Sequence, residues 1–257
     1  MNVQTLTSII NQVLPEPHAG LLAGLMFGTK TSLSQELYDA LVRSGTLHIV
    51  ALSGMNISIV AGILGGMFTV VMSKRVASLV ILLAIWWFVL FVGPSASIVR
   101  AAIMGSISLL AVVSGRQYWS IFSWVLATTA MLLLNFQWLF DISFQLSVLA
   151  TLGIILFGKT EKNILLSDLR LTLSAQVFTI PIILYHFHRI SLISPVSNIL
   201  IGWLIGPLTM LGWGTVFFGS LWLPLGKIIA WIDWTLLSYL VAVVTWTAKV
   251  PFASLGF

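Results

Sequence analysis

The chain has 257 residues, of which 59% are hydrophobic and only 7% are charged, and its net charge is +5 at neutral pH. An ordinary soluble domain carries about 25% charged residues, so the composition excludes a soluble domain and predicts an integral membrane protein. The sequence contains no cysteine, which excludes disulfides, thiolate metal sites and cysteine nucleophiles.

The first 46 residues differ from the rest of the chain. Three glycines recur every four residues in an apolar run that is too short to cross a bilayer, Gly20, Gly24 and Gly28, and this run predicts a re-entrant or interfacial element. Ser32 and Gln35 form a capping-box pattern ahead of a short amphipathic helix that Gly45 can end. We therefore divide the chain into an N-terminal interfacial segment, residues 1–46, and a transmembrane domain, residues 47–257.

Eight apolar stretches follow that approach the length of about 20 residues needed to cross a bilayer. They lie at 48–72, 76–93, 97–114, 118–136, 141–158, 170–187, 192–222 and 228–249. The seventh is too long for one straight span and holds Gly206 and Pro207 at its middle, which predicts two half helices or one strongly broken helix. The predicted fold is an all-α polytopic membrane protein with about seven or eight transmembrane helices.

The basic residues predict an orientation, because Lys and Arg accumulate in short cytoplasmic loops. One side of this arrangement carries Lys74, Arg75, Arg116, Lys159, Lys162, Arg170 and Lys227, and the other carries Lys30, Arg43, Arg189 and Lys249. This asymmetry places both termini on the outer side if the stretch 192–222 crosses once. If that stretch turns back, the C-terminus lies inside.

The first group of candidate site residues lies around the start of the first span. His48 stands at its mouth, and Ser53, Gly54 and Asn56 follow. A polar side chain in hydrocarbon needs a partner or water, so His48 and Asn56 are candidates for a wet site. Small residues recur every four positions from Gly54 through Ser58 and Gly62 to Gly66, and this stripe predicts close packing of another helix or, less simply, a pore lining.

The second and third groups place charge and hydroxyl groups inside predicted spans. Gly93 and Pro94 end one helix, and Arg100 is then carried about one turn into the next. Such a guanidinium should face carboxylates, carbonyls or water, so an ion pair with Asp141 and a role in anion passage are both open. Further along, Gln145, Ser147 and a threonine four residues later suit either interhelical hydrogen bonds or a hydrated path.

The fourth group is aromatic and basic. Tyr185, His186 and His188 follow a proline-kinked span, and Asn198 leads toward the predicted break at Pro207. The two histidines would diverge on a helix, so no metal site is predicted. No nucleophile elbow, P-loop or HExxH motif occurs, and we expect neither a catalytic centre nor a cofactor.

Four strings of sequence contain these groups: GTLHIVALSGMNISIV from Gly45, PSASIVRAAIMG from Pro94, FDISFQLSVLATLG from Phe140, and QVFTIPIILYHFHRISLISPVSNIL from Gln176. In this order they resemble the competence domain of the ComEC family of bacterial DNA-uptake channels. The resemblance covers nearly the whole chain from about Ala19. The family usually has a second histidine where Asn56 stands, and this departure weakens any protonation role at that position.

The resemblance implies a channel that passes one strand of DNA across the bacterial cytoplasmic membrane during natural transformation. It also implies single-stranded DNA, the lipid bilayer, a DNA receptor and a cytoplasmic helicase or motor as partners, with self-association left open. Members often carry an OB-like domain before this region and a metallo-β-lactamase-like domain after it. Neither is in this sequence, so we expect a transport protein and not an enzyme.

The predicted path for DNA is lined by small, polar and charged residues of the four groups. They are His48, Ser53, Gly54, Asn56, Arg100, Asp141, Gln145, Ser147, Tyr185, His186 and Asn198. Two alternatives use the same features. Broken helices and intramembrane charges also suit a small-molecule or ion transporter, and polar groups that merely bond helices together suit a non-conducting membrane scaffold.

Overall fold

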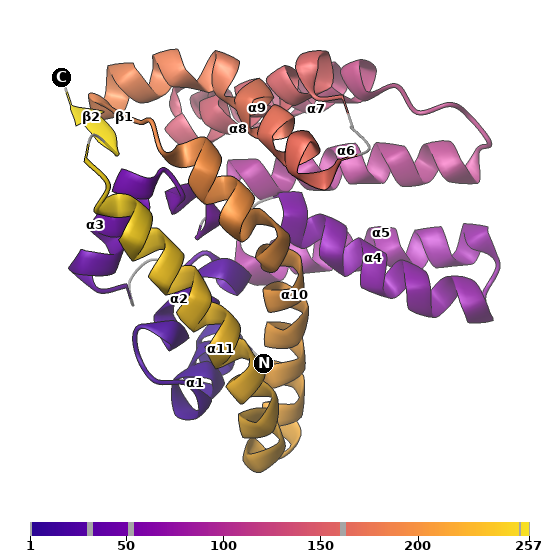
Figure 1. The fold of residues 1–257 in the computed structure, drawn as a ribbon. Helices are drawn as coiled ribbons and strands as arrows, with labels where there is room; N and C mark the ends of the chain where they lie inside the picture. Colours follow the sequence, from indigo (N-terminus) through magenta and orange to yellow (C-terminus); the bar gives the residue numbers. More distant parts are fainter. Residues whose placement is uncertain (1, 30–32, 51–53, 160–162, 252, 257) are drawn as a thin grey trace. The chain divides into compact units, whose positions relative to one another are not determined.

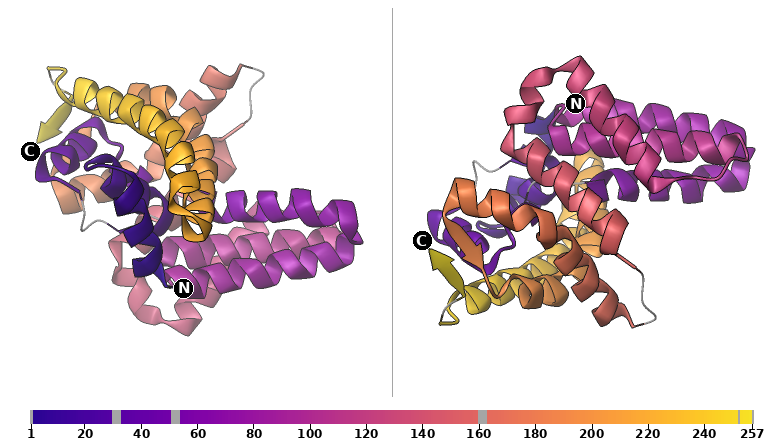
Figure 2. Two further views of the ribbon diagram at one scale, coloured as in Figure 1. Left: turned by 90° about the horizontal axis from the view of Figure 1, so that it is seen from below. Right: turned by 90° about the horizontal axis from the view of Figure 1, so that it is seen from above.

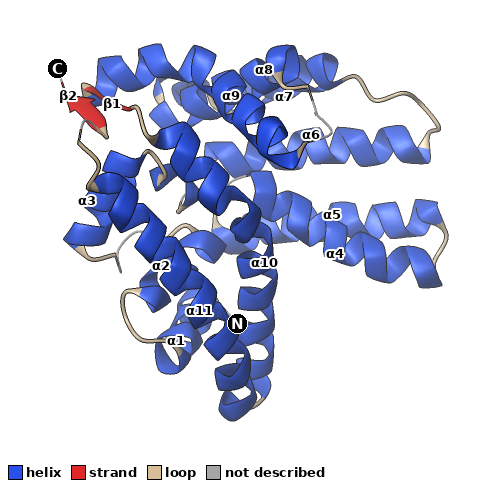
Figure 3. Cartoon of the chain, viewed as in Figure 1, coloured by secondary structure: helices blue, strands red, loops and turns tan. Residues whose placement is uncertain are grey.

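The computed structural model describes residues 2–29, 33–50, 54–159, 163–251 and 253–256 (Figure 1). Eleven α-helices account for most of the described residues, and two short strands, β1 and β2, form the one sheet among them (Figure 3). The chain divides into two compact units. The terminal unit comprises Met1–Leu52, Thr160–Leu173 and Ile183–Phe257, and the middle unit comprises Ser53–Lys159 and Ser174–Ile182. The predicted all-α fold is confirmed.

The terminal unit contains both ends of the chain. Its elements are α1 (Val3–Val13), α2 (His18–Phe27), α3 (Gln35–Ser44), the 3-10 turn η1 (Leu47–Ile49), β1 (Arg189–Ser191), α10 (Ser194–Leu221), α11 (Leu223–Ala248) and β2 (Ser254–Gly256). α9 (Ile164–Phe187) has its ends in this unit and its middle in the other. β1 and β2 pair antiparallel with Ile190 opposite Leu255. α1 and α2 pack on α10 and α11, and α3 packs on α11. The division into an interfacial segment and a transmembrane domain after residue 46 stays a prediction.

The N-terminal segment forms three helices. α1 was not predicted, because its exposed face is polar and its apolar residues Leu6, Ile9 and Ile10 are too few to raise its hydropathy; these three nevertheless form one buried face. The short apolar run forms α2, in which every residue from Ala19 to Phe27 is buried in protein. Burial inside the unit shields the apolar side chains of this helix, which is too short to span a bilayer.

The predicted amphipathic helix is confirmed as α3, with a different cap. Ser34, and not Ser32, occupies the N-cap, and its hydroxyl oxygen accepts a hydrogen bond from the Leu37 N–H at 3.3 Å. Ser32 lies outside the described residues. Gly45 ends the helix with φ +72°, a left-handed conformation that glycine adopts without a steric penalty. A Cβ at this position would also lie 2.5 Å from the Ser194 Cβ.

The prediction that residues 192–222 form two half helices is wrong. α10 runs without interruption from Ser194 to Leu221 with Pro207 inside it, and Figure 1 shows the helix changing direction along its length. Proline removes one backbone hydrogen bond and crowds the carbonyl four residues earlier, which bends a helix. Two separate half helices would leave many more backbone groups unpaired in an apolar environment, so a bend within one helix costs less.

α10 and α11 form a closely packed hairpin. Gly219 and Gly226 face each other where the two helices meet, and a Cβ on Gly226 would lie 2.6 Å from the Gly219 Cα. Further along the hairpin, the Thr215 hydroxyl donates a 2.6 Å hydrogen bond to Oδ2 of Asp233, whose side chain is fully buried. Oδ1 of Asp233 is buried and has no hydrogen-bond partner among the described residues. Glycine contact and a polar pair therefore both hold this hairpin together.

Thr215→Val is expected to lower the free energy of unfolding by about 1–3 kcal/mol, because it removes the hydrogen-bond donor to a buried carboxyl group. Unfolding of the detergent-solubilised protein, followed by tryptophan fluorescence, measures this change. Thr245→Val is the matched control on the same hairpin, since the Thr245 hydroxyl bonds only to carbonyls of its own helix. Equal destabilisation by the two variants would show that the Thr215–Asp233 bond contributes nothing.

The middle unit consists of helices joined by short connections. They are α4 (Gly54–Val71), α5 (Lys74–Val92), α6 (Ala96–Val113), α7 (Ser120–Leu134), the 3-10 turn η2 (Phe136–Phe140), α8 (Ile142–Phe157) and the middle of α9. α4, α5 and α6 lie side by side in Figures 1 and 2, and α6 also packs against α7 and α8. The Trp124 indole N–H donates to the Val148 carbonyl at 2.9 Å and joins α7 to α8.

Five helices of the described chain are long and apolar enough to cross a membrane: α4, α5, α6, α10 and α11. α7 and α8 are shorter apolar helices of 15 and 16 residues. Large apolar side chains are exposed along them, among them Trp87, Leu133 and Trp231, as expected where hydrocarbon and not water is the solvent. The chain is therefore a multi-pass helical membrane protein, and the count of seven or eight spans stays a prediction.

The predicted packing stripe on the first span is wrong over most of its length. A Cβ on Gly54 would lie 3.2 Å from the Ala101 Cβ, but a Cβ on Gly62 or Gly66 would meet no described atom within 4 Å. Close approach through glycine occurs elsewhere in this unit: a Cβ on Gly153 would collide with the Ser174 carbonyl oxygen of α9. Spacing by four places glycines on one face, but only the arrangement of neighbouring helices decides which face is covered.

Candidate functional site

Arg100 is carried into the middle unit by the local sequence before α6. Gly93 ends α5 with φ +109°, and Ser95 is the N-cap residue of α6. The proline between them cannot continue α5 and favours a new start. Arg100 then lies about one turn into α6, and its side chain is half-buried. Placing a guanidinium within a spanning helix costs free energy unless other groups bond to it. The groups around Arg100 therefore indicate its role.

The guanidinium of Arg100 is held by neutral groups. Its Nε donates a 2.9 Å hydrogen bond to the Ser147 hydroxyl, and one terminal nitrogen donates to the Thr151 hydroxyl and lies 3.7 Å from the Met104 sulfur. Ser147 and Thr151 are one turn apart on α8, and Thr151 in turn donates to the Ser147 carbonyl at 2.9 Å. The Ser147 hydroxyl also donates to that of Ser97 at 3.2 Å. Two helices therefore orient the arginine without neutralising it.

The alternative of an ion pair between Arg100 and Asp141 is not observed. Oδ1 of Asp141 instead accepts a 2.7 Å hydrogen bond from the Phe144 N–H and caps the start of α8. Within the described chain the Arg100 guanidinium contacts the uncharged groups of Ser147, Thr151 and Met104. Its positive charge is thus available to an anion that reaches it.

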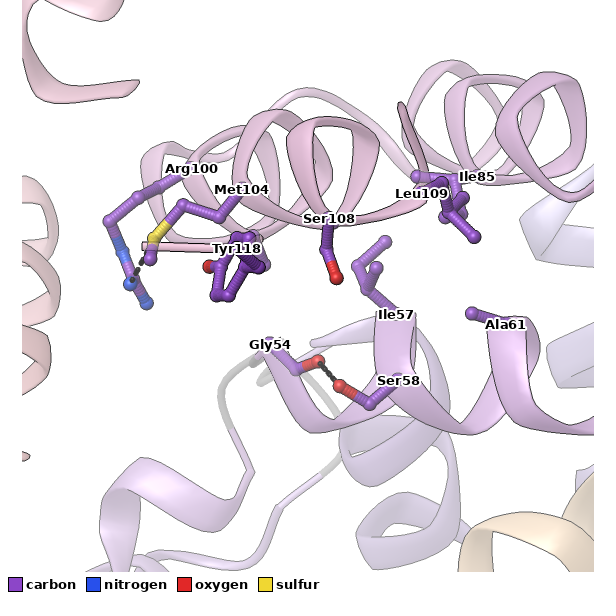
Figure 4. Close-up of a pocket in the computed structure, with 12 residues that line it drawn as sticks. Gly54, Ile57, Ser58, Ala61, Ile85, Arg100, Met104, Ser108, Leu109 and Tyr118 are labelled. Atoms are coloured by element: carbon purple, nitrogen blue, oxygen red, sulfur yellow. Dashed lines mark hydrogen bonds between the residues drawn. The ribbon is translucent and has the colours of Figure 1, made fainter. Parts of the chain in front are cut away.

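A cavity of about 490 Å³ lies beside Arg100, between α4 and α6 (Figure 4). Its wall contains polar groups from α4, from α6 and from the connection after α6: Gly54, Ser58, Arg100, Ser108 and Tyr118. Figure 4 shows Arg100 at one end of the group, with Tyr118 between it and Ser108. Apolar side chains, among them Ile57 and Leu109, complete the wall. The cavity combines one charge, several hydroxyls and an apolar surface.

The remaining predicted residues of the middle unit are bonded within the protein. Gln145 donates its side-chain N–H to the Leu139 carbonyl at 2.8 Å, and Asn56 is buried and has a partner in the protein. Of the residues predicted here, Gly54 and Arg100 line the cavity and Ser147 contacts Arg100 directly. Gln145 and Asp141 therefore both form local hydrogen bonds at the start of α8.

Four predicted residues belong to the terminal unit. His48 is exposed in η1, with Nδ1 3.2 Å from the Gly45 carbonyl oxygen. Tyr185 and His186 are exposed at the end of α9, with ring centroids 5.1 Å apart in a T-shaped contact. Asn198 donates to the Ser194 hydroxyl at 3.5 Å, and its amide oxygen is buried without a hydrogen-bond partner in the described chain. Ser53 lies outside the described residues.

Three residues of the cavity wall and one buried carboxyl group were not predicted from the sequence. Met104 and Ser108 follow Arg100 at intervals of four and so share its face of α6, a spacing that could have identified them. Tyr118 reaches the cavity from the connection after α6, and no sequence pattern predicts that. Asp233 was overlooked although it is the one acidic residue in the apolar run of α11, and it is fully buried.

No group of three or more metal-binding side chains occurs among the residues that the structure describes. Spanning helices, exposed apolar surface and an arginine beside a partly polar cavity define a multi-pass membrane protein with a cationic side chain in the wall of a cavity. The sequence family described as "Competence protein" matches residues 25–257, and the chain therefore belongs to the competence protein family.

One curated relative is ComE operon protein 3 of Bacillus subtilis (strain 168), which is 31% identical over 197 residues. The alignment covers 75% of this chain but 25% of the relative, so the matched region is about a quarter of that protein's length. No solved structure is significantly similar to the chain. The family membership confirms the resemblance carried by the four sequence strings.

Proposed function

We propose that this protein passes single-stranded DNA across the bacterial cytoplasmic membrane during DNA uptake. Membership of the competence protein family supports a role in DNA uptake. The observation that carries the more specific step is Arg100, a cation in a spanning helix that hydroxyl groups orient and that lines an open cavity. Both termini lie outside in this proposal, as the basic residues predict.

The chemistry of the cavity suits a moving polyanion. DNA phosphates are attracted to guanidinium groups, and the strength of that attraction depends on how many are neutralised. A single arginine offers one contact, and the hydroxyls of Ser58, Ser108 and Tyr118 add neutral ones. Weak contacts of this kind allow entry and release, whereas a dense cluster of cations would hold the strand.

The proposal includes partners that supply binding and movement. The sequence contains no nucleotide-binding loop, so the energy for transport is assigned to a cytoplasmic helicase or motor. Capture of DNA is assigned to a receptor on the outer side. Arg100 and the cavity beside it would then act as a passive conduit between the two.

The test uses duplex DNA with a different label on each strand, offered to competent cells that carry the wild-type protein or an Arg100→Ala, Asn56→Leu double variant. We expect the wild-type cells to internalise label from one strand only. We expect the double variant to lose most of that uptake at equal membrane abundance. Normal uptake by the double variant would remove the proposed path, and entry of both labels would contradict passage of a single strand.

A second candidate, a transporter of small anions, is favoured by the cavity volume. About 490 Å³ falls within the range of pockets that enclose one small-molecule ligand. A nucleoside monophosphate offered to proteoliposomes distinguishes the two candidates. Transport of the monomer, inhibited by Arg100→Gln, together with normal DNA uptake in cells, would favour the transporter.

A further inference from the structure

A second cavity in the middle unit lies where α6 ends and α7 begins, and it has a volume of about 390 Å³. Its wall includes Leu110, Ala111, Arg116, Trp119, Phe122 and Ser123. α6 is a candidate membrane span, and the connection after it runs back alongside α6 to the start of α7 (Figure 1). Trp119 in that connection is 66% exposed.

The polar groups beside this cavity are suited to an anion. Arg116 is exposed in the connection, and no carboxylate lines the cavity among its described residues. Trp119 is the N-cap residue of α7 and provides no side-chain cap. The N–H groups of the first turn of a helix have no partner within the helix, and together with the helix dipole they favour a negative charge.

The wall of the cavity also contains large apolar side chains and one unpaired hydroxyl. Leu110 is 50% exposed and Phe122 is 59% exposed, on two neighbouring apolar helices. Ser123 is 1% exposed, and its hydroxyl has no hydrogen-bond partner among the described residues. A buried hydroxyl without a partner costs free energy, so it favours a ligand that brings an acceptor oxygen into the cavity.

We propose that this cavity binds one anionic phospholipid. The phosphate lies against Arg116 and the start of α7, an ester oxygen of the glycerol backbone accepts from Ser123, and an acyl chain follows Leu110 and Phe122. A ligand with a negative charge, ester oxygens and a long apolar chain matches the three kinds of group that line the cavity. A lipid also approaches from the hydrocarbon that covers the exposed apolar side chains.

This site is separate from the Arg100 cavity in all but one residue, since only Tyr118 lines both. The inference therefore does not depend on the proposed passage of DNA. Its chemistry predicts headgroup selectivity. Phosphatidylglycerol has a net negative charge that Arg116 can neutralise, whereas the choline of phosphatidylcholine already neutralises its own phosphate.

The test is native mass spectrometry of the full chain released from nanodiscs that contain equal amounts of phosphatidylglycerol and phosphatidylcholine. We expect the wild type to retain one phosphatidylglycerol. Arg116→Gln should weaken its retention by about tenfold or more, because a charge-assisted hydrogen bond is lost. Ala111→Phe, which fills the cavity without changing charge, should also release the lipid.

Arg75→Gln is the matched control, because Arg75 is likewise exposed at the start of an apolar helix and lies outside the cavity. It should retain the lipid as the wild type does. Equal retention by Arg116→Gln and Arg75→Gln would overturn the proposal, as would retention of phosphatidylcholine equal to that of phosphatidylglycerol. Displacement of the lipid by inorganic phosphate or by a short single-stranded oligonucleotide would also overturn it, because the site would then recognise phosphate alone or DNA.

Discussion

Arg100→Gln should reduce DNA uptake by at least about tenfold, while Arg100→Lys should retain part of it. Glutamine keeps a side chain that can bond to hydroxyls but removes the charge that faces the cavity, and a hydrogen bond to a charged group contributes about 1.5–3 kcal/mol. Lysine keeps the charge, but its single nitrogen cannot reproduce the two directions in which Arg100 donates to Ser147 and Thr151. The readout is labelled DNA that becomes resistant to external nuclease.

The hydroxyl partners provide a graded check on this result. Thr151→Val removes one contact of the guanidinium and leaves its charge, so uptake should fall less than in Arg100→Gln. Arg75→Gln makes the same change of charge outside the cavity and should leave uptake unchanged. If Arg100→Gln took up DNA normally at equal membrane abundance, the arginine would have a structural role only.

Gly226→Ala should be among the most destabilising single substitutions in the terminal unit. The added Cβ would lie 2.6 Å from the Gly219 Cα, 2.9 Å from the Gly219 nitrogen and 3.2 Å from the Thr215 carbonyl oxygen. All three are backbone atoms, so relief requires α10 and α11 to separate along the hairpin. Overpacking of this kind costs about 1–3 kcal/mol or more, measured as a lower free energy of unfolding in detergent.

Gly62→Ala is the control for this effect. A Cβ on Gly62 would meet no described atom within 4 Å, and alanine is the better helix former by about 1 kcal/mol. The variant should therefore be neutral or slightly more stable. A similar loss of stability in Gly62→Ala and Gly226→Ala would show that backbone flexibility, and not helix contact, explains the effect.

The helices of the transmembrane domain were predictable from the sequence because a bilayer imposes one simple requirement. A segment that crosses hydrocarbon must be apolar for about 20 residues and must pair its own backbone groups. Local breaks such as Gly93 and Pro94 then set the positions of helix starts, and Arg100 entered its helix where expected. These features depend on neighbouring residues along the chain, which a sequence displays directly.

Features that depend on contact between distant segments were predicted less well. The glycine stripe on α4 was expected to pack closely, but the structure places the tight crossings at Gly153, Gly219 and Gly226. Asp141 was a candidate partner for Arg100 and instead caps α8. In each case several partners were chemically acceptable, and the choice among them depended on which helices come together.

By itself the sequence determined that the protein lies in a membrane, the positions of the helices of its transmembrane domain, its family and the presence of an arginine inside a span. Only the tertiary structure decided that hydroxyl groups on α8 orient this arginine, that it borders a cavity, and that Asp233 is paired with Thr215. The physical reason is that hydropathy is a sum over neighbours in the chain, whereas a hydrogen bond or a cavity requires atoms from different helices at set distances.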